Sequence, residues 1–371
     1  MCEALRNKWG RCQILAVLAF FLQIFACSGN PLKPSSPSPS SPSGWIWQNP
    51  LPQGNGLWDV SFTDVDTGVV VGEIGAILRT VDGGATWVNQ TSGEGTALTG
   101  VSFVDGNNGV AVGMHGIILR TTDGGATWVK QNSGTTYWLT DVAVTDADTG
   151  TVVGCPGMIL RTTDGGATWE RQTSGTNKLL FAVSFTDANT GTAVGEGGTI
   201  LRTTDGGATW VGQTSGTSEI LWDVFFTDAN TGLAVGNSGT MLRTTDGGTT
   251  WVSLPSVTND DLFAVAFANA SVGIAVGRSV ILRTADGGDT WVSHPSGTRR
   301  ELLNVSFVNA STGTIVGEGG TILRTTDGGD TWVGQTSGTN NSLFGVSFTD
   351  ANTGTVVGAF GTILRTTTGG E

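Results

Sequence analysis

Short apolar, β-branched segments alternate along the chain with turns rich in Gly, Asn and Asp. Residues 180–213 show one full period, in which LFAVSF, TAVGE, TILRT and TWVGQ are dominated by Val, Ile, Thr, Phe and Trp. The separators TDANTG, GG and DGGA contain the residues that favour tight turns. Beyond the N-terminal segment no stretch has a convincing 3.6-residue apolar period. The pattern therefore predicts an all-β chain of short strands.

The four-segment pattern recurs at a nearly constant interval. An Asp at the centre of the phrase TTDGGATW and its variants recurs every 41 residues, with one interval of 40, at Asp82, Asp123, Asp164, Asp205, Asp246, Asp286 and Asp327. The arginine of the ILR segment occurs eight times, from Arg79 to Arg365. A period of about 40–45 residues with four short strands is typical of propeller blades. We therefore predict an eight-bladed β-propeller of four-stranded blades, with a seven-bladed ring as the alternative.

The last repeat is split between the two ends of the chain. The tryptophan segment occurs seven times, at Trp87, Trp128, Trp169, Trp210, Trp251, Trp291 and Trp332, whereas the eighth copy stops at TTTGGE. The stretch GWIWQNP at 44–50 supplies the missing segment when Trp45 is aligned with Trp87. We expect residues 343–366 to form three strands of the last blade and residues 45–49 the fourth. Such a clasp favours a closed ring over an open array, because it leaves few strand edges free.

The first 43 residues have the features of targeting and tethering segments. Three basic residues precede an apolar stretch at 14–26, which predicts a signal peptide over residues 1–26. The IFAC that follows resembles the lipobox of bacterial lipoproteins, which implies cleavage before Cys27 and its lipidation. Residues 27–43 are rich in Pro and Ser and predict a solvated tether, so the propeller domain covers 44–371. We expect an exported, lipid-anchored protein of the bacterial cell envelope, with simple secretion as the alternative.

The recurring phrase resembles the Asp-box, or BNR, pattern Ser/Thr-x-Asp-x-Gly-x-Thr-Trp. Its carboxylate can accept backbone N–H groups inside a turn, and its glycines allow positive φ. Its Trp is a large apolar wedge toward the turn and the neighbouring blade. We interpret the Asp and Trp residues as turn staples, because seven copies cannot share one active site. The arginines are expected to pair with a carboxylate or a carbonyl of their own blade.

Alternating strand direction places the loops between second and third strands on the same face as the loops between blades. We call this the funnel face, and we expect the Asp-boxes on the opposite face. The repeats diverge in the funnel-face loops, which makes these loops the candidate binding surface. The candidate residues are Glu73, His115, Tyr137, Trp138, Glu196, Asn237, Arg278, Arg299, Arg300, Glu318 and Phe360. Trp58, Trp222 and Phe263 each stand two residues before a valine expected to be buried, which favours a core position for them.

Charge and composition narrow the function. The net charge is −13 and no basic block occurs, which argues against a nucleic acid or an anionic membrane surface as partner. With two histidines in the chain, we identify no Ser/His/Asp set, metal cluster or phosphate loop, so we expect no metal or cofactor. An acidic rim studded with aromatic residues suits the recognition of a peptide or a sugar. A surface protein without a specific ligand is a third possibility.

Residues 45–371 resemble throughout the photosystem II stability/assembly-factor family, whose propellers consist of VGxxGxILRTxDGGxTW units. The resemblance implies a non-catalytic scaffold that binds a protein partner, and we expect a monomer that is not an enzyme. Plant and cyanobacterial members have seven blades, whereas the repeat count here gives eight. The alternative is a carbohydrate-binding module or glycoside hydrolase. Sialidases also carry Asp-boxes, but they need a tyrosine nucleophile and an arginine triad, and this chain has one tyrosine and no visible triad.

Overall fold

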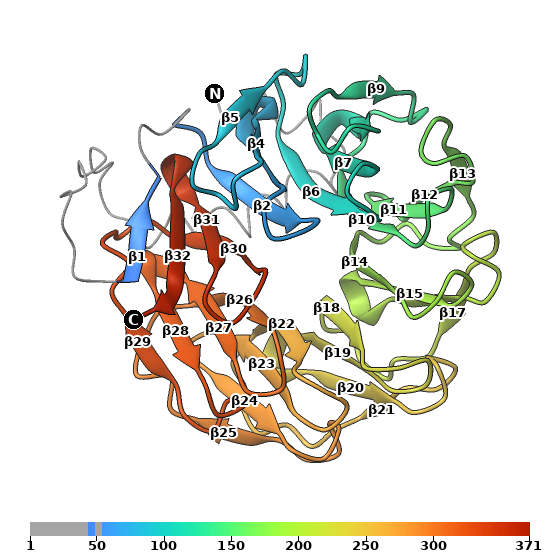
Figure 1. Cartoon of the computed structure of the whole chain (residues 1–371). Helices are drawn as coiled ribbons and strands as arrows, with labels where there is room; N and C mark the ends of the chain where they lie inside the picture. Colours follow the sequence, from blue (N-terminus) through green and yellow to red (C-terminus); the bar gives the residue numbers. More distant parts are fainter. Residues whose placement is uncertain (1–43, 49–53) are drawn as a thin grey trace, which may run out of the picture.

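Eight four-stranded antiparallel sheets surround a central axis (Figure 1). This computed structural model describes residues 44–48 and 54–371, so the predicted signal peptide, Cys27 and the tether lie outside the described residues. The all-β, eight-bladed prediction is confirmed. Within the described ranges, no helix has the length and apolar character needed to cross a membrane.

The strands of each blade run outward from the axis in sequence order, except that the outermost strand of the eighth blade comes from the N-terminal side. The innermost strands are β2 (Leu57–Phe62), β6 (Leu98–Phe103), β10 (Leu139–Val144), β14 (Leu180–Phe185), β18 (Leu221–Phe226), β22 (Leu262–Phe267), β26 (Leu302–Phe307) and β30 (Leu343–Phe348). The second strands are β3 (Gly68–Gly72), β7 (Gly109–Gly113), β11 (Gly150–Gly154), β15 (Gly191–Gly195), β19 (Gly232–Gly236), β23 (Gly273–Gly277), β27 (Gly313–Gly317) and β31 (Gly354–Gly358).

The outer half of each blade is formed by two further strands. The third strands are β4 (Ile77–Thr80), β8 (Ile118–Thr121), β12 (Met158–Thr162), β16 (Ile200–Thr203), β20 (Met241–Thr244), β24 (Ile281–Thr284), β28 (Ile322–Thr325) and β32 (Ile363–Gly370). The fourth strands are β5 (Val88–Gln90), β9 (Val129–Gln131), β13 (Glu170–Gln172), β17 (Val211–Gln213), β21 (Val252–Ser253), β25 (Val292–His294), β29 (Val333–Gln335) and β1 (Gly44–Trp47). Short 3₁₀ turns follow six second strands, namely η1 (Glu73–Gly75), η2 (Met114–Gly116), η3 (Glu196–Gly198), η4 (Asn237–Gly239), η5 (Glu318–Gly320) and η6 (Ala359–Gly361).

The eighth blade is built from both ends of the described chain. Its strand order is β1-β32-β31-β30, and Ile46 pairs with Arg365 just as Val88 pairs with Arg79 in the first blade. The predicted split blade and its register are therefore confirmed, with the fourth strand at Gly44–Trp47 instead of 45–49. In Figure 1 the blue β1 lies beside the dark red β32.

A glutamine of the seventh blade holds the two ends together. The side chain of Gln335 accepts a hydrogen bond from Trp45 Nε1 (2.7 Å) and donates one to the carbonyl of Gly369 (2.9 Å). Trp45 is 2% exposed and meets Phe348 edge to face at a centroid distance of 6.0 Å. The clasp is thus fixed by apolar packing inside its own blade and by hydrogen bonds to the preceding one.

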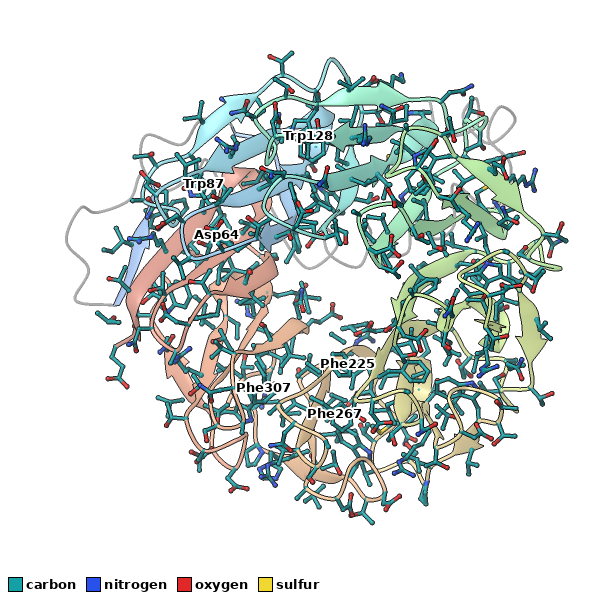
Figure 2. The ribbon with its side chains drawn as sticks, turned by 45° about the vertical axis from the view of Figure 1, so that its right-hand side comes forward. Asp64, Trp87, Trp128, Phe225, Phe267 and Phe307 are labelled. Atoms are coloured by element: carbon teal, nitrogen blue, oxygen red, sulfur yellow. The ribbon has the colours of Figure 1, made fainter. Side chains whose placement is uncertain are left out.

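The core consists of apolar side chains shared between neighbouring blades. One cluster joins Val69 and Val71 of the first blade to Leu98 and Trp128 of the second, and similar clusters recur around the ring. Aromatic rings also meet across blades, as Figure 2 shows for Phe225 and Phe267, which stack at 5.8 Å. Complete burial of a Val, Leu or Phe side chain stabilises a fold by about 1.5–3 kcal/mol, so this repeated packing stabilises the ring.

The residues of each Asp-box form a hydrogen-bonded turn. In the second blade, the carboxylate of Asp123 accepts the N–H (2.8 Å) and the hydroxyl (2.6 Å) of Thr127. The hydroxyl of Thr121 donates to the same carboxylate (2.8 Å) and accepts the N–H of Gly125 (2.8 Å). Trp128 closes the motif by donating to the Gly125 carbonyl (3.1 Å). Gly125 has a φ of 81°, a conformation that residues with a Cβ rarely adopt.

The arginines of the third strands connect neighbouring blades, which corrects the expectation that they pair within their own blade. Arg79 Nε donates to the carbonyl of Gly124 (2.7 Å) in the Asp-box turn of the next blade. The equivalent bonds are Arg120–Gly165, Arg161–Gly206, Arg202–Gly247, Arg243–Gly287, Arg283–Gly328 and Arg365–Gly83. Arg324 differs, because it donates to the Thr314 hydroxyl of its own blade (3.0 Å) and to the Ala351 carbonyl of the next. The guanidinium groups therefore bridge blade boundaries.

Candidate binding site in the central channel

Backbone hydrogen bonds define the two faces of the ring. Glu73 N donates to the Gly56 carbonyl (2.8 Å), which joins the loop after the second strand to the segment that enters the blade. Gly83 N donates to the Asp66 carbonyl (2.8 Å), which joins the Asp-box turn to the turn after the first strand. The loop partition expected from the sequence is thus present, with the funnel face on one side and the Asp-boxes on the other.

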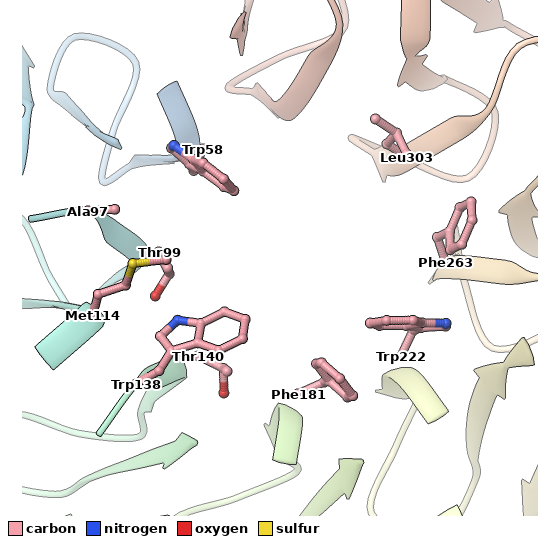
Figure 3. Close-up of a pocket in the computed structure, with 10 residues that line it drawn as sticks. All are labelled: Trp58, Ala97, Thr99, Met114, Trp138, Thr140, Phe181, Trp222, Phe263 and Leu303. Atoms are coloured by element: carbon pink, nitrogen blue, oxygen red, sulfur yellow. The ribbon is translucent and has the colours of Figure 1, made fainter. Parts of the chain in front are cut away.

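A pocket of about 220 Å³ lies where the central channel meets the funnel face (Figure 3). The second residue of seven innermost strands lines it, which are Trp58, Thr99, Thr140, Phe181, Trp222, Phe263 and Leu303. Ala97, Met114 and Trp138 complete the lining. We call Trp58, Trp138, Phe181, Trp222 and Phe263 the aromatic collar. Figure 3 shows these side chains around an open centre, so they form a ring of apolar surface at the channel mouth.

Contacts between neighbouring blades hold the collar in place. Phe181 and Trp222 lie 4.5 Å apart at 47°, and Trp222 meets Phe263 at 6.5 Å and 73°. Trp222 Nε1 also donates to the Asn237 side chain (2.6 Å), and Trp58 stacks on Phe344 at 5.8 Å. Because these rings are fixed before any ligand arrives, a ligand would not have to order them on binding.

The position of the collar corrects the core assignment of Trp58, Trp222 and Phe263. That assignment assumed strict alternation along the innermost strands. Instead, each innermost strand has a bulge at this point, since Leu57 pairs with Gly72 whereas Asp59 pairs with the adjacent Val71. The extra residue breaks the two-residue period. Trp58 therefore lines the channel although Val60, two positions on, is buried in the core.

A carboxylate follows the collar in the first blade. Asp59 accepts the N–H of Val60 (2.8 Å) and, with its other oxygen, the N–H of Val101 in the second blade (2.9 Å). The innermost strand has no neighbouring strand on its axial side, so these are open-edge N–H groups that need an acceptor. Asp59 thus lies in the channel wall at the boundary between two blades.

The same arrangement recurs in every second blade. Asp141 accepts from Val142 (2.8 Å) and Val183 (2.9 Å), and Asp223 accepts from Val224 (2.8 Å) and Val265 (2.9 Å). In the seventh blade, Asn304 accepts the N–H of Val305 (2.8 Å) and donates to the Phe344 carbonyl (3.1 Å). The even-numbered blades have small residues at this position, namely Gly100, Ala182, Ala264 and Gly345. We call Asp59, Asp141 and Asp223 the channel carboxylates.

The electrostatics of the channel carboxylates are unusual for aspartates. Burial raises the pKa of all three, and it raises the pKa of Asp141 to about 7. The N–H bonds from Val183 and Val142 oppose this shift, whereas the charges of Asp59 and Asp223 add to it. Among the described residues, none of the salt bridges includes a channel carboxylate. The channel wall therefore carries acidic groups without a cationic neighbour in the described structure.

The three glutamates predicted for the funnel face hold the loops of their own blades. Glu73, Glu196 and Glu318 each accept the N–H of the residue before the innermost strand. These bonds join Gly56 to Glu73 (2.9 Å), Leu179 to Glu196 (3.2 Å) and Glu301 to Glu318 (3.4 Å). The bonds give each glutamate a structural role, and ligand binding by them stays a prediction.

The predicted basic residues gather between the sixth and seventh blades. Arg278 Nε lies 3.2 Å from Glu301, and its Nη2 lies 3.6 Å from Asp261. Burial and the nearby Glu318 raise the pKa of Glu301. Arg299 and Arg300 are exposed in the loop that leads to Glu301. The cluster is internally paired at Arg278 and open to solvent at the other two arginines.

The remaining predicted residues are spread over the rim. His115 Nδ1 lies 3.0 Å from the Thr96 hydroxyl, and Tyr137 and Phe360 are 42% and 49% exposed. Asn237 contacts the collar through Trp222. Of the eleven predicted binding residues, Trp138 alone lines the pocket. The channel carboxylates were missed, although their recurrence in every second repeat was visible in the sequence.

The chain is similar to one protein family and to several solved propellers. A family model described as "Photosynthesis system II assembly factor YCF48" matches residues 40–132, 90–176, 213–299 and 295–371. The structure "YCF48 bound to D1 peptide" is 22% identical, with a TM-score of 0.61, and the match covers 90% of this chain and 100% of that one. YCF48 from Cyanidioschyzon merolae is also 22% identical, with a TM-score of 0.59 and coverage of 87% and 98%. The computationally designed Ika8 protein is 14% identical, with a TM-score of 0.72 and coverage of 85% and 96%. No curated protein matches the chain.

Proposed function

The chain belongs to the photosynthesis system II assembly factor YCF48 family, and from that membership we propose that it is a non-catalytic scaffold that binds a segment of a protein partner at the aromatic collar. The observation that carries this proposal is the pocket of five fixed aromatic rings at the mouth of the channel. Aromatic side chains combine a large apolar area with a polar edge, and they dominate the energetics of many protein interfaces.

The relatives support a peptide as the occupant. One solved member of the family is described as bound to D1 peptide. For this chain we propose the same kind of ligand, a short extended segment of another protein. The pocket of about 220 Å³ at the collar has room for one or a few side chains of such a segment.

A peptide selection tests the proposal directly. The full chain is immobilised, a library of random peptides is selected against it, and affinities of enriched peptides are measured by calorimetry. We expect the Trp222→Ala, Phe263→Ala double variant to lose most of this binding. The control is Val252→Ala, which removes an exposed apolar side chain from an outermost strand, away from the channel. Enrichment of no peptide, or equal affinity for the collar variant, would refute the proposal.

A glycan is the second candidate ligand, because aromatic faces also stack on sugar rings. Trp138 favours it specifically, since its indole ring lines the pocket and offers a large apolar face to a sugar ring. A glycan array probed with the full chain tests this candidate, and turnover of aryl glycosides tests the related hydrolase. Binding to a glycan that Trp138→Phe abolishes would replace the peptide proposal.

We also propose that the chain is exported, anchored in the bacterial cell envelope through Cys27, and monomeric. The apolar N-terminal stretch and its lipobox-like ending support export, and the Pro/Ser-rich residues 27–43 would hold the propeller away from the membrane. Mass spectrometry of the mature N-terminus gives the cleavage site and any lipid in one measurement. An intact N-terminal Met in the mature protein would contradict export by this route. Light scattering of the purified protein gives the oligomeric state.

A further inference from the structure

We propose that the channel beneath the aromatic collar receives a basic side chain, lysine or arginine, from the extended segment that the collar binds. The inference rests on the proposed function, and it adds the chemical class of the ligand side chain that enters the channel. It is carried by the arrangement of the aromatic collar and the channel carboxylates, which occupy successive positions on β2 and β18.

The acidic ring lies directly below the aromatic one. Each innermost strand enters the blade from the funnel face, so Asp59 lies one residue deeper in the channel than Trp58, and Asp223 one residue deeper than Trp222. A side chain that passes the collar from the funnel face therefore meets the channel carboxylates next.

Lysine and arginine fit this order of surfaces. Both have an apolar stem that packs on hydrophobic surface while the charged group stays in a polar environment. The stem would lie against Trp58 and Trp222, and the positive charge would lie within reach of the carboxylates. The aromatic faces add a cation–π attraction for the charged group on its way in. A norleucine side chain has a similar apolar stem but no charge, so it would use only the collar.

The channel carboxylates still have the capacity to accept hydrogen bonds. Each oxygen of Asp59 accepts one backbone N–H, and a carboxylate has about four acceptor sites. The other two channel carboxylates have the same pattern. Their remaining lone pairs are available to an ammonium or guanidinium group. Acidic groups enclosed by protein without a positive neighbour are unfavourable, and a bound cation relieves that penalty.

The molecule as a whole also favours a basic segment. The net charge of −13 attracts positively charged peptides and repels acidic ones at low ionic strength. Burial raises the pKa of all three channel carboxylates, and it raises that of Asp141 to about 7, so part of the Asp141 population is protonated near neutral pH. A cation bound beside them would stabilise the ionised form and lower these pKa values.

A pair of matched peptides tests the inference with the unaltered full chain. The probes are Ac-Ser-Gly-Leu-Lys-Leu-Gly-Ser-amide and the same peptide with norleucine in place of lysine, titrated while tryptophan fluorescence is recorded. We expect the lysine peptide to bind at least about 10-fold more tightly at pH 8, and this preference to shrink as salt is added. Equal affinities, or tighter binding of the norleucine peptide, would overturn the inference and leave the collar proposal standing.

Substitution of the carboxylates then locates the effect. Asp59→Asn, Asp141→Asn and Asp223→Asn are combined, because Asn304 shows that an asparagine at this position still accepts the N–H of the valine that follows it in its own blade. The triple variant is expected to lose the lysine preference and to keep its affinity for the norleucine peptide. The control combines Asp66→Asn, Asp148→Asn and Asp105→Asn, which removes the same charge from turns on the opposite face. A lysine preference that survives in the channel variant would refute the inference, as would binding of neither probe to the unaltered chain. The peptide selection independently decides whether the proposed function survives either result.

Discussion

Arg365 in the last blade donates a hydrogen bond from Nε to the carbonyl oxygen of Gly83 in the first blade, at 2.6 Å, although the two residues are 282 positions apart. Six other blade boundaries have the equivalent bond between residues 44 or 45 positions apart. The ring is thus closed by the same contact that joins neighbours along the chain. Closure therefore has two components, the strand β1 and this guanidinium.

Replacing the closing arginine should destabilise the ring as much as replacing an internal one. Arg365→Met removes the bond to Gly83, and Arg161→Met removes the bond to Gly206 (2.6 Å) between the third and fourth blades. Hydrogen bonds with a charged partner contribute about 1.5–3 kcal/mol, so each variant should lose free energy of unfolding in that range. Urea denaturation measures both losses. An unchanged midpoint for Arg365→Met beside a lowered one for Arg161→Met would show that closure does not use this bond.

The N-terminal strand should contribute through one tryptophan. Trp45 is almost completely buried, whereas Ile46 beside it is 61% exposed. Trp45→Ala should lower the free energy of unfolding by about 3–5 kcal/mol, because it leaves a cavity against Phe348. The matched control, Ile46→Ala, should change it by less than about 0.5 kcal/mol. Thermal denaturation followed by circular dichroism compares them, and similar melting temperatures would contradict the clasp.

The Asp-boxes should show a graded response to substitution. Trp169 is buried and donates to Gly166 (3.1 Å), and Trp169→Ala should lower the free energy of unfolding by about 3–5 kcal/mol. Asp164 is a solvent-exposed acceptor in the same turn, comparable to a helix cap, and Asp164→Ala should lower it by about 1 kcal/mol. Urea denaturation of the two variants gives the order. A larger loss for Asp164→Ala would mean that the carboxylate has a role beyond the turn.

The channel carboxylates should make stability depend on pH. The pKa of Asp141 is raised from 3.8 to about 7, so folding favours its protonated form. Its contribution to stability is fully present below pH 3.8 and is lost as the pH rises through 7. We expect the unfolding free energy of the unaltered protein, minus that of Asp141→Asn, to fall between pH 4 and pH 8.

Asp164 provides the control of opposite sign. Hydrogen bonds from Thr168 lower its pKa to about 2, so its contribution is present above pH 3.8 and is lost as the pH falls through 2. The difference between the unaltered protein and Asp164→Asn should therefore be constant from pH 5 to pH 8. Urea denaturation at several pH values measures both differences. A constant difference for Asp141→Asn as well would show that burial does not shift this group.

Much of the architecture could be predicted from the sequence because each blade repeats the same local signals. The eight copies of the ILR arginine predicted the blade count, and the alignment of Trp45 with Trp87 predicted the shared blade and its register. These predictions needed only local turn chemistry and counting. The repetition did not reveal the binding site. The pattern of one repeat predicts the strands of a blade but not which side chains of different blades meet in the channel.

The collar and the channel carboxylates depend on geometry that a sequence pattern does not contain. A bulge between Leu57 and Asp59 moves Trp58 out of the alternation on which the core assignment was based. The direction of the arginines was also undetermined, since Arg79 reaches the turn of the next blade and not its own. The bulge is a detail of strand pairing within a blade, and the arginine bond crosses to the next blade; residue spacing along the chain determines neither.

The hydrogen-bond acceptors on the innermost strands alternate from one blade to the next around the ring, and this alternation favours an even number of blades. Asp59 serves its own blade and the next one, and the position recurs 82 residues later at Asp141, with a small residue in between. An even number of blades lets donors and acceptors match at each junction. An odd number would bring two acceptor blades, or two blades without one, side by side at a single seam. A ring of this kind that gained or lost repeats two at a time would keep this match, so the structural unit of the channel wall is a pair of blades.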